Sequence, residues 1–447
     1  MTNPIAARGQ LCYKLRMEII SASVCLPVDQ APLADGGIAI DHGKIVAVGT
    51  AAELAKQYPD ATVHNHPKQA LIPGLVNAHL HVDLAQFCCT PFVATPASET
   101  TEAPPSTPHV HWLRQSLEFR QKAQLPQIIE SIQHCLTRLT QYGVTTVGAF
   151  STYDAAHELF AKSGLRATIF AELFGSAPAE GTQDRFESAL ALHEKLGNGN
   201  NHIQLGLAPL APYLLSRNVL GIVSQHAAAD HIPLAIHAAE SFEEMEFFFN
   251  SSGPIGTEIF PLMGWGAASG QELPPPYKKT PIQYLADIGF LAAHPTIIGG
   301  LHLSAGDVAL LKKHACCVVF CPRAVRAFSL GEFPLGKLLE AGVTVALGTE
   351  AQFSSTNGDV WDEMRAALQF GGLPADQVLR MATLESAKTL GRADTIGSLT
   401  PGKFADYVLV DLPTPTSAER AAEQLIQSTT TTRVHNVVVG GKSLKNA

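Results

Sequence analysis

The sequence predicts an α/β protein in which a (β/α)8 TIM-type barrel carries a composite β-sandwich domain built from both ends of the chain. Through the middle of the chain, apolar strand candidates alternate with helical stretches, which is typical of a parallel sheet covered by helices. There are eight such candidates, the number that closes into a barrel. Short β-rich runs without intervening helices precede this region, and similar runs follow it. We therefore expect residues 1–70 and 396–447 to form the sandwich and residues 71–395 to form the barrel.

The composition limits the kinds of partner. Of 447 residues, 46% are hydrophobic and 16% are charged, which indicates a compact globular chain. The formal net charge of -9 argues against a nucleic-acid partner or an anionic membrane and favours a small-molecule substrate. No signal-peptide core or membrane-spanning run is evident, and the eight cysteines match no zinc-knuckle or disulfide pattern. We expect a cytoplasmic protein with reduced, mostly buried thiols.

The predicted sandwich strands come from turn-separated runs at both chain ends. Turn formers such as Asp41-His42-Gly43 separate the N-terminal runs, which predicts a small antiparallel sheet there and no βα unit. The C-terminal runs have the same character, so we expect the two ends to meet in one domain. The runs cover residues 18–24, 37–40, 44–48, 405–411 and 434–442.

The predicted barrel strands are separated by helix signals. An apolar stripe at helical spacing runs from Ile128 to Leu139 and stops before Gly143. Ser304 and Asp307 resemble a capping box that starts another helix. Two insertions are interpreted either as lids at the barrel mouth or as solvated linkers, and they cover residues 90–108 and 251–279. The eight strands cover residues 71–81, 144–150, 165–173, 203–210, 232–237, 296–301, 317–321 and 343–350.

Candidate metal ligands stand where predicted strands end. His79 and His81 are two residues apart, so a strand directs both imidazoles to the same side. The fifth strand ends at His237, with Glu240 three residues later, and the eighth strand ends at Glu350. A catalytic zinc or iron site takes about three protein ligands and keeps a position for water, while a nearby carboxylate can transfer protons. A bare H-x-H pair or a single strand-end histidine is more often a surface or structural feature. The metal hypothesis therefore depends on the strand ends sharing one mouth.

These positions and several longer motifs together resemble the amidohydrolase superfamily. Within it they are similar to the metal-dependent deaminase and chlorohydrolase branch, which includes aminodeoxyfutalosine and S-adenosylhomocysteine deaminases. The resemblance runs from about residue 17 to the C-terminus. Its motifs are Leu71 to His81, His237-x-x-Glu240, Val345 to Glu350, Asp362-Glu363-Met364-Arg365, Met381-Ala382-Thr383 and Ile396 to Asp406.

The resemblance implies a cofactor and roles for individual residues. One divalent metal ion is expected, with zinc first and iron or manganese as alternatives, because no lysine ends the third or fourth strand to bridge a second ion. Glu240 would move protons from water to the leaving group, and a homodimer is compatible with this branch. His302 is either at the rim of the substrate site or structural. The implied metal ligands are His79, His81, His237 and Glu350, and the implied substrate contacts are Tyr213, Arg323 and His302.

Several positions depart from the pattern of this branch. Leu210 replaces a substrate-binding histidine, and Gly299 stands where the sixth strand usually ends in a histidine that contacts water or substrate. Ala324 and Val325 are apolar where the branch has polar residues. Glu350 replaces an aspartate, and its side chain is longer by about 1.5 Å. The pocket should therefore be less polar than that of adenosine-type deaminases.

Two functions are compatible with the sequence. The first is a mononuclear metal-dependent amidohydrolase that hydrolyses a non-peptide C–N bond, by deamination of an aminated heterocycle or a nucleoside-like small molecule. The second is a catalytically silent protein of the same fold that binds a ligand, and the changes at Gly299, Leu210 and Glu350 point that way. The intact His79, His81, His237 and Glu240 favour the enzyme, because buried imidazoles without a chemical role are costly.

Overall fold

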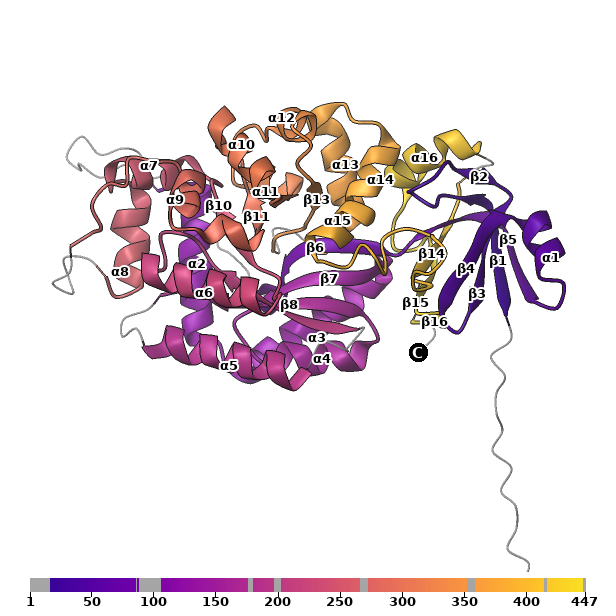
Figure 1. Cartoon of the computed structure of the whole chain (residues 1–447), viewed down its shortest axis with the longest axis horizontal. Helices are drawn as coiled ribbons and strands as arrows, with labels where there is room; N and C mark the ends of the chain where they lie inside the picture. The colour runs from indigo at the N-terminus through magenta and orange to yellow at the C-terminus, as the bar shows by residue number, and fades with distance from the viewer. Residues whose placement is uncertain are drawn as a thin grey trace, which may run out of the picture.

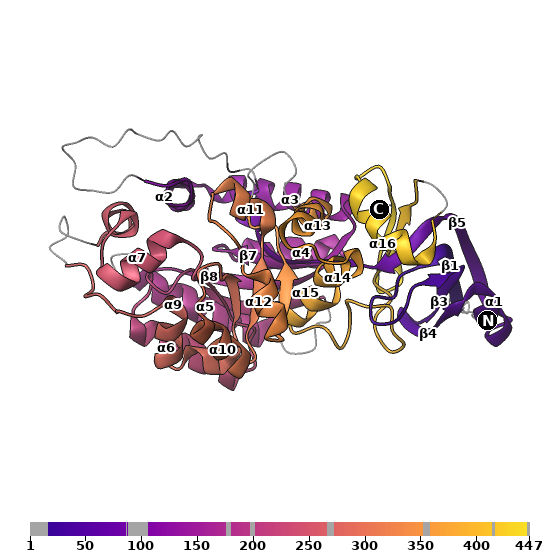
Figure 2. The ribbon, with the colours of Figure 1, turned by 90° about the horizontal axis from the view of Figure 1, so that it is seen from above.

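A barrel and a β domain lie next to each other along the long axis of the molecule (Figure 1 and Figure 2). The computed structural model describes residues 17–85, 87, 106–175, 180–196, 202–265, 272–351, 358–413 and 416–444. The buried ion pair between Arg166 and Asp406 joins the two parts. The Arg166 Nε donates to Asp406 Oδ2 over 2.6 Å, and its Nη2 donates to Oδ1 over 3.0 Å. Such a two-pronged contact fixes orientation as well as position.

The β domain is a single hydrogen-bonded sheet to which both chain ends contribute, which confirms that the ends meet. Its strand order is β16-β15-β14-β5-β1-β3-β4, with β2 paired to β1. The expected antiparallel sheet is in fact mixed, because β1 and β5 run parallel while the other pairs are antiparallel. The strands are β1 Glu18–Cys25, β2 Leu33–Ala34, β3 Gly36–Asp41, β4 Lys44–Thr50, β5 Thr62–Pro73, β14 Tyr407–Asp411, β15 Val434–Val439 and β16 Lys442–Ser443.

The barrel consists of two four-stranded parallel sheets. The first half-barrel has the order β6-β7-β8-β9 and the second has the order β10-β11-β12-β13. Parallel bridges join Leu80 to Glu350 and Leu207 to Leu234, and these close the ring. The eight predicted barrel strands are all present. They are β6 Leu75–His81, β7 Val144–Ser151, β8 Arg166–Leu173, β9 Ile203–Pro209, β10 Ala235–Ala238, β11 Thr296–Gly299, β12 Cys317–Phe320 and β13 Val345–Leu347.

The first barrel strand begins later than the sequence predicts. The apolar run 71–81 is divided at Gly74, and residues 71–73 belong to β5 of the β domain. In β5, Leu71 pairs with Leu409 and Ile72 with Val408 on β14. Both segments are buried and apolar, so the pattern alone does not show where one strand ends and the next begins. The predicted division after residue 70 thus falls inside β5.

The helices cover the outside of the barrel (Figure 1), as the alternating pattern predicts. Helix α3 buries the predicted stripe of Ile128, Ile132, Cys135 and Leu139. The capping box is also present, because Ser304 accepts from the Asp307 N–H and Asp307 accepts from the Ser304 N–H. The helices are α1 Ala51–Gln57, α2 Pro108–Lys122, α3 Leu125–Gln141, α4 Ala155–Ser163, α5 Glu180–Leu196, α6 Arg217–Ala229, α7 Phe242–Asn250, α8 Phe260–Leu262, α9 Pro281–Asp287, α10 Ala305–Lys313, α11 Pro322–Ala327, α12 Leu335–Glu340, α13 Val360–Gly371, α14 Ala375–Met381, α15 Leu384–Thr389 and α16 Ala421–Ser428.

The two insertions fall partly outside the described residues, which exclude 90–105 and 266–271. Within the described ranges, α2 starts at Pro108, and residues 255–262 form a π-helical turn followed by the short helix α8. A search of the described helices finds none with the length and apolar character needed to cross a bilayer.

Candidate metal centre

Strand β6 places His79 and His81 against the end of β13. The carbonyl of His79 accepts from the backbone N–H groups of Thr349 and Glu350 over 2.9 and 3.2 Å. The N–H of His81 donates to the Glu350 carbonyl over 2.8 Å. These bonds close the barrel at its mouth and set the two imidazoles beside the Glu350 carboxylate. The predicted juxtaposition of the first and eighth strands is therefore present in the fold.

Three imidazoles and one carboxylate converge at the barrel mouth. Glu350 Oε2 lies 3.0 Å from His79 Nε2, and Glu350 Oε1 lies 3.1 Å from His81 Nε2 and 3.7 Å from His237 Nε2. The Nε2 atoms of His79 and His237 are 3.3 Å apart. In a tetrahedral zinc site with bonds of about 2.0–2.1 Å, the ligand atoms are separated by about 3.3 Å. The spacing of the four groups therefore fits a single ion at their centre.

The electrostatic environment acts differently on the four groups. Burial lowers the pKa of His79 to about 4, so its imidazole is neutral at physiological pH. Burial by itself would raise the pKa of Glu350, but the neighbouring histidines outweigh it and hold that pKa well below its usual range. Neutral imidazole and ionised carboxylate are the metal-binding forms. Burial would lower the pKa of His81, but Glu172 and Glu350 outweigh it and raise that pKa to about 10. Against the same effect of burial, Glu350 likewise raises the pKa of His237, so a metal ion would displace a proton from these two rings. Glu350 Oε2 is buried, receives no hydrogen bond of regular geometry among the described residues and faces His79 Nε2 at 3.0 Å, as expected where a cation would lie between the two atoms.

Tight backbone geometry supports the second half of the cluster. Glu350 and Ala239 adopt the left-handed region, with φ values of 61° and 53°. This region is unusual for residues other than glycine, and such strain is concentrated at functional sites. Gly348 is required beside them, because a Cβ at this position would lie 2.8 Å from the Cβ of His79. The motif Gly348-Thr349-Glu350 therefore combines close packing with a carboxylate.

The His237 ring is oriented by a backbone carbonyl. Its Nδ1 lies 3.1 Å from the carbonyl oxygen of Leu210, which can only accept a hydrogen bond. A proton therefore resides on Nδ1, and Nε2 is the nitrogen that could present a lone pair to a metal ion. Fixing the tautomer in this way is a regular feature of metal-binding histidines. Leu210 thus orients the candidate ligand His237 through its backbone carbonyl, and this contact does not depend on the Leu210 side chain.

A buried charge network holds His81 from behind. Its Nδ1 lies 3.2 Å from Glu172 Oε1 on β8, and Arg120 on α2 donates to Glu172 Oε2 over 2.8 Å. Arg120 also lies 3.5 Å from Asp83. Burial would raise the pKa of Glu172, but Arg120 and His81 outweigh it and lower that pKa. The ionised Glu172 can accept the Nδ1 proton of His81, which leaves Nε2 for the metal.

Sequence analysis missed this network. Glu172 gave a usable signal, because it is a carboxylate near the end of a predicted barrel strand. Arg120 gave none, since it lies in a helix after an insertion and reaches the site only through tertiary packing. The three acidic and imidazole groups His81, Asp83 and Glu172 are close enough to bind a cation, and the Arg120 guanidinium occupies the space between them.

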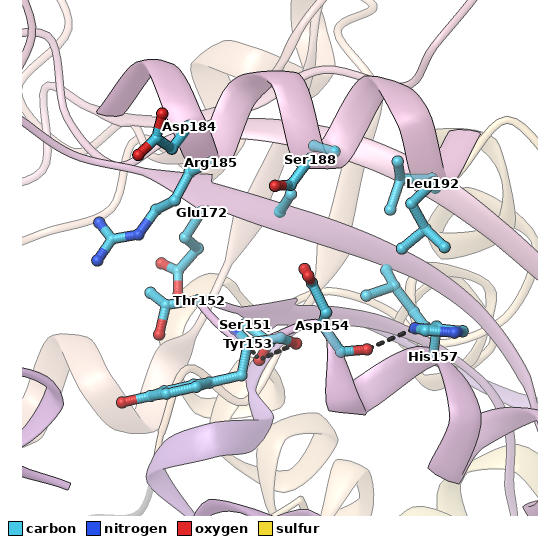
Figure 3. Close-up of a pocket in the computed structure, with 14 residues that line it drawn as sticks. Ser151, Thr152, Tyr153, Asp154, His157, Glu172, Asp184, Arg185, Ser188 and Leu192 are labelled. Atoms are coloured by element: carbon cyan, nitrogen blue, oxygen red, sulfur yellow. Dashed lines mark hydrogen bonds between the residues drawn. The ribbon is translucent and has the colours of Figure 1, made fainter. Parts of the chain in front are cut away.

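A cavity of about 290 Å³ lies between strands β7–β9 and helices α4 and α5 (Figure 3). Glu172 lines it together with Arg185, Thr152 and Tyr153, which gives its inner end a polar character. In Figure 3, Arg185 comes from α5 and Glu172 from β8, on the same side of the cavity. Glu172 therefore belongs both to the cavity wall and to the network behind His81.

Glu240 follows β10 at the mouth of the barrel. Its backbone N–H donates to Glu244 Oε2 over 2.9 Å, and Ser241 caps the next helix, α7. Its own carboxylate lies 3.6 Å from the Nε2 of His109, a residue of α2. Because the Glu240 side chain is only slightly exposed, the carboxylate is close to bulk water without being freely hydrated.

The position of Gly299 contains no empty space for a larger side chain. Gly299 ends β11 with a φ of 90°, and a Cβ built on it would lie 2.8 Å from the Cβ of Glu240. A histidine at this position would therefore displace Glu240. Gly299 therefore leaves room for the Glu240 side chain, and a sixth-strand histidine would not be compatible with the observed position of Glu240.

The three predicted substrate contacts lie outside the four-residue cluster. Tyr213 is buried and lines a cavity of about 480 Å³ together with residues of α6 and α9. Arg323 faces Glu363, whose Oε2 accepts its backbone N–H over 3.0 Å and whose Oε1 lies 3.7 Å from its guanidinium. His302 lines a separate hollow beside Phe242 of α7.

Comparison with known proteins gives a consistent result. Residues 70–444 match the Amidohydrolase family, and residues 36–61 match an imidazolonepropionase-like composite domain of bacteria. An aminodeoxyfutalosine deaminase of Deinococcus radiodurans is 28% identical over 80% of this chain and 81% of its own. A 5-methylthioadenosine/S-adenosylhomocysteine deaminase of Moorella thermoacetica is 28% identical over 95% and 93%. The crystal structure of Helicobacter pylori aminofutalosine deaminase with methylthio-coformycin has a TM-score of 0.81 at 25% identity, over 95% of this chain and 99% of the other.

Proposed function

Because this chain belongs to the amidohydrolase family, as its motifs predicted, we propose that it is a mononuclear metal-dependent hydrolase that deaminates an aminated heterocycle or a nucleoside-like molecule. Water adds to the ring carbon that bears the amino group, the C–N bond breaks, and ammonia leaves a ring carbonyl behind. The observation that carries the proposal is the convergence of three Nε2 atoms and one carboxylate at donor spacings of 3.0 to 3.7 Å.

The metal would be held by His79, His81, His237 and Glu350, which are buried and together form the predicted ligand set. Nitrogen and carboxylate donors suit zinc, and they also accept iron or manganese. A bound ion of this kind activates water for nucleophilic attack near neutral pH. The protein supplies a neutral His79 imidazole, an ionised Glu350 carboxylate and orienting contacts for the His81 and His237 rings.

Glu240 is the proposed proton-transfer group. It accepts a proton from the attacking water and passes it to the leaving nitrogen, so that the departing group is neutral ammonia. A positioned acid or base of this kind typically contributes about 100- to 10,000-fold in rate. Support for the role comes from its place at the strand mouth, three residues after His237, with its main chain fixed by Glu244.

The proposed substrate class follows from the relatives and from the mouth of the barrel. Two deaminases that resemble this chain over most of its length act, by their names, on nucleoside-like molecules. Leu210, Ala324 and Val325 place buried apolar side chains where the branch has polar residues, which would make the pocket less polar. This favours a flat heterocycle with an apolar substituent. Contacts from Tyr213, Arg323 and His302, the cytoplasmic location and a homodimer stay predictions from the sequence.

The first measurement is the metal content of the purified protein and of His81→Ala. We expect about one zinc, iron or manganese ion per wild-type chain and a much lower content in the variant. If neither form carries near-stoichiometric metal, the hydrolase proposal is wrong.

The second measurement is an ammonia-release screen over aminopurines, pterins, triazines and aminated nucleosides. Wild-type protein should release ammonia from at least one class. Glu240→Gln should retain its metal and lose about 100-fold or more in kcat. A metal-loaded wild type that releases no ammonia from any class would support the silent binding protein, and equal rates in the variant would remove Glu240 from its role.

A further inference from the structure

Helix α2 brings a buried imidazole to the barrel mouth that neither the metal cluster nor the proton-transfer role of Glu240 uses. His109 is the second residue of α2, after Pro108 and the N-cap Thr107, whose hydroxyl accepts the Val110 N–H. The side chain is 7% exposed, and its Nε2 lies 3.6 Å from Glu240 Oε2. A segment distant in sequence from β10 therefore contributes a partner to the Glu240 carboxylate.

The surroundings of His109 are acidic on one side and aromatic on the other. Three carboxylates act on the ring, from Glu240, from Glu243 of α7 and from Glu350 after β13. Burial would lower the pKa of His109, but these carboxylates outweigh it and raise that pKa. The ring packs near Phe328, with 5.5 Å between centroids. The imidazolium form is thus favoured beside Glu240.

Most buried side-chain nitrogen atoms have a hydrogen-bond partner in the protein or in ordered water. The Nδ1 of His109 is buried and has no hydrogen-bond partner within the described part of the chain. Leaving such an atom unpaired costs free energy unless something else binds it. The ring contacts the Glu240 carboxylate with Nε2, while Nδ1 is buried and has no partner among the described residues.

The helix that carries His109 is itself anchored next to the metal cluster. Trp112, one turn further along α2, packs against Phe328 with 5.2 Å between ring centroids and lies 6.2 Å from the His81 ring. Arg120, two turns later, reaches the charge network behind His81. Opposite His109, the side chain of Glu240 packs over Gly299, where no side chain competes for the space.

We propose that His109 is the positioning residue of the proton-transfer group: its imidazolium holds the Glu240 carboxylate in place over Gly299. In this arrangement the positive charge beside Glu240 is the His109 imidazolium, which α2 carries after the first barrel strand. Glu240 then has one defined orientation towards the attacking water and the leaving nitrogen. The inference rests on the proposed hydrolase function.

The test uses the metal-loaded full chain with His109→Gln, His109→Asn and the control His111→Gln. His111 lies on the same helix, and its Nε2 contacts Gln115 instead of Glu240. We expect His109→Gln to keep its metal and to lose about 100-fold in kcat with KM changed less than about threefold, because misplacing a reacting group has about this cost. The decline of the wild-type rate at high pH, as His109 loses its proton, should disappear. His111→Gln should stay within about twofold of wild type.

A double-mutant cycle gives the sharper criterion. In the Glu240→Gln background, His109→Gln should have almost no further effect, because the group that it positions is already lost. Additive losses, or a kcat within about threefold of wild type in both His109 variants, would overturn the inference while the hydrolase proposal stands. If His109→Gln does not fold, His109→Asn decides by the same criteria.

A measurement without turnover separates the two proposals. NMR titration of the His109 ring should show a lower pKa in Glu240→Gln than in wild type. If no probe releases ammonia, the hydrolase proposal fails, and the role of His109 in proton transfer fails with it. An unchanged pKa overturns the His109–Glu240 pairing, whether or not the enzyme is active.

Discussion

The two half-barrels supply the same site by different means. Strands β6–β9 of the first half have seven or eight residues, whereas strands β10–β13 of the second half have three or four. The first half contributes His79, His81 and Glu172, and the second contributes His237 and Glu350. The H-x-H pair lies on one of these longer strands, β6, whose register with β7 shifts between Asn77 and Leu80. Short strands leave more of the second half to loops that carry single polar groups.

The difference extends to how each ligand is oriented. His81 is held by charged side chains, through Glu172 and Arg120. His237 is held by the Leu210 carbonyl, and Glu350 by a left-handed backbone conformation. Removing one charge should weaken the network that holds His81. The position of the Glu350 carboxylate depends instead on the backbone and on the length of the side chain. The comparison therefore predicts distinct responses to substitution in the two halves.

The largest effect is expected for Glu350→Asp in the second half. The shorter side chain withdraws the carboxylate by about 1.5 Å from the positions that lie 3.0 Å from His79 and 3.1 Å from His81. A displacement of about 1 Å can cost about 100-fold in rate, so kcat should fall by at least this amount. Ammonia release and zinc titration measure it. Higher activity in Glu350→Asp would mean that the longer glutamate displaces the metal and that the backbone at position 350 does not compensate for its length.

An intermediate effect is expected for Glu172→Gln in the first half. Removing this charge leaves Arg120 without its closest carboxylate and weakens the acceptor of the His81 Nδ1 proton. Changes of this kind typically cost about 10- to 100-fold in metal affinity. Chelator competition measures the zinc Kd, with the exposed Glu187→Gln on α5 as control. Equal affinities would show that the charge network does not orient His81.

The smallest effect is expected for Glu244→Gln, behind the loop that carries Glu240. Burial raises the pKa of Glu244 to about 8. A carboxyl group whose folded-state pKa is raised stabilises the fold fully below its unfolded value of about 4.5, and this stabilisation is lost as pH rises towards about 8. Metal-free wild-type protein should thus become less stable between pH 5 and 8, and the variant should show a flatter dependence.

Urea midpoints at pH 5 and pH 8 measure this difference, with Glu246→Gln on the same helix as control. The decrease of the urea midpoint from pH 5 to pH 8 should be smaller in Glu244→Gln than in wild type. It should not disappear, because burial also raises the pKa of Glu363 to about 8 and that of Asp359 to about 6. Identical slopes in wild type and Glu244→Gln would contradict the assignment of a buried, protonated Glu244.

Much of the fold and the cluster of candidate ligands was predictable because both depend on local patterns. Apolar runs between helical stretches identified the eight barrel strands, and strand-end positions identified His79, His81, His237 and Glu350. The division between the β domain and the barrel was predicted a few residues too early. Two buried strands follow each other across Gly74, and their separation depends on the partner β14.

Of the remaining site residues, Glu172 gave a signal as a carboxylate near a strand end, whereas no local feature distinguishes His109 and Arg120. His109, Arg120 and Glu172 reach the site by the packing of α2 and β8 around the mouth. The departure at Gly299 suggested a missing function, whereas in the fold the Glu240 side chain packs over this glycine. The sequence does not give tertiary contacts, so it cannot show that the side chain of one residue occupies the space beside a distant glycine.

By itself, the amino-acid sequence determined the class of fold and the chemical nature of the ligands, since periodicity selects strands and helices and residue type sets donor chemistry. Only the tertiary structure decided which nitrogen of each histidine faces Glu350, which carboxylate supports His81 and which imidazole meets Glu240. These choices depend on distances of a few ångströms between segments far apart in the chain, and local patterns do not encode such distances.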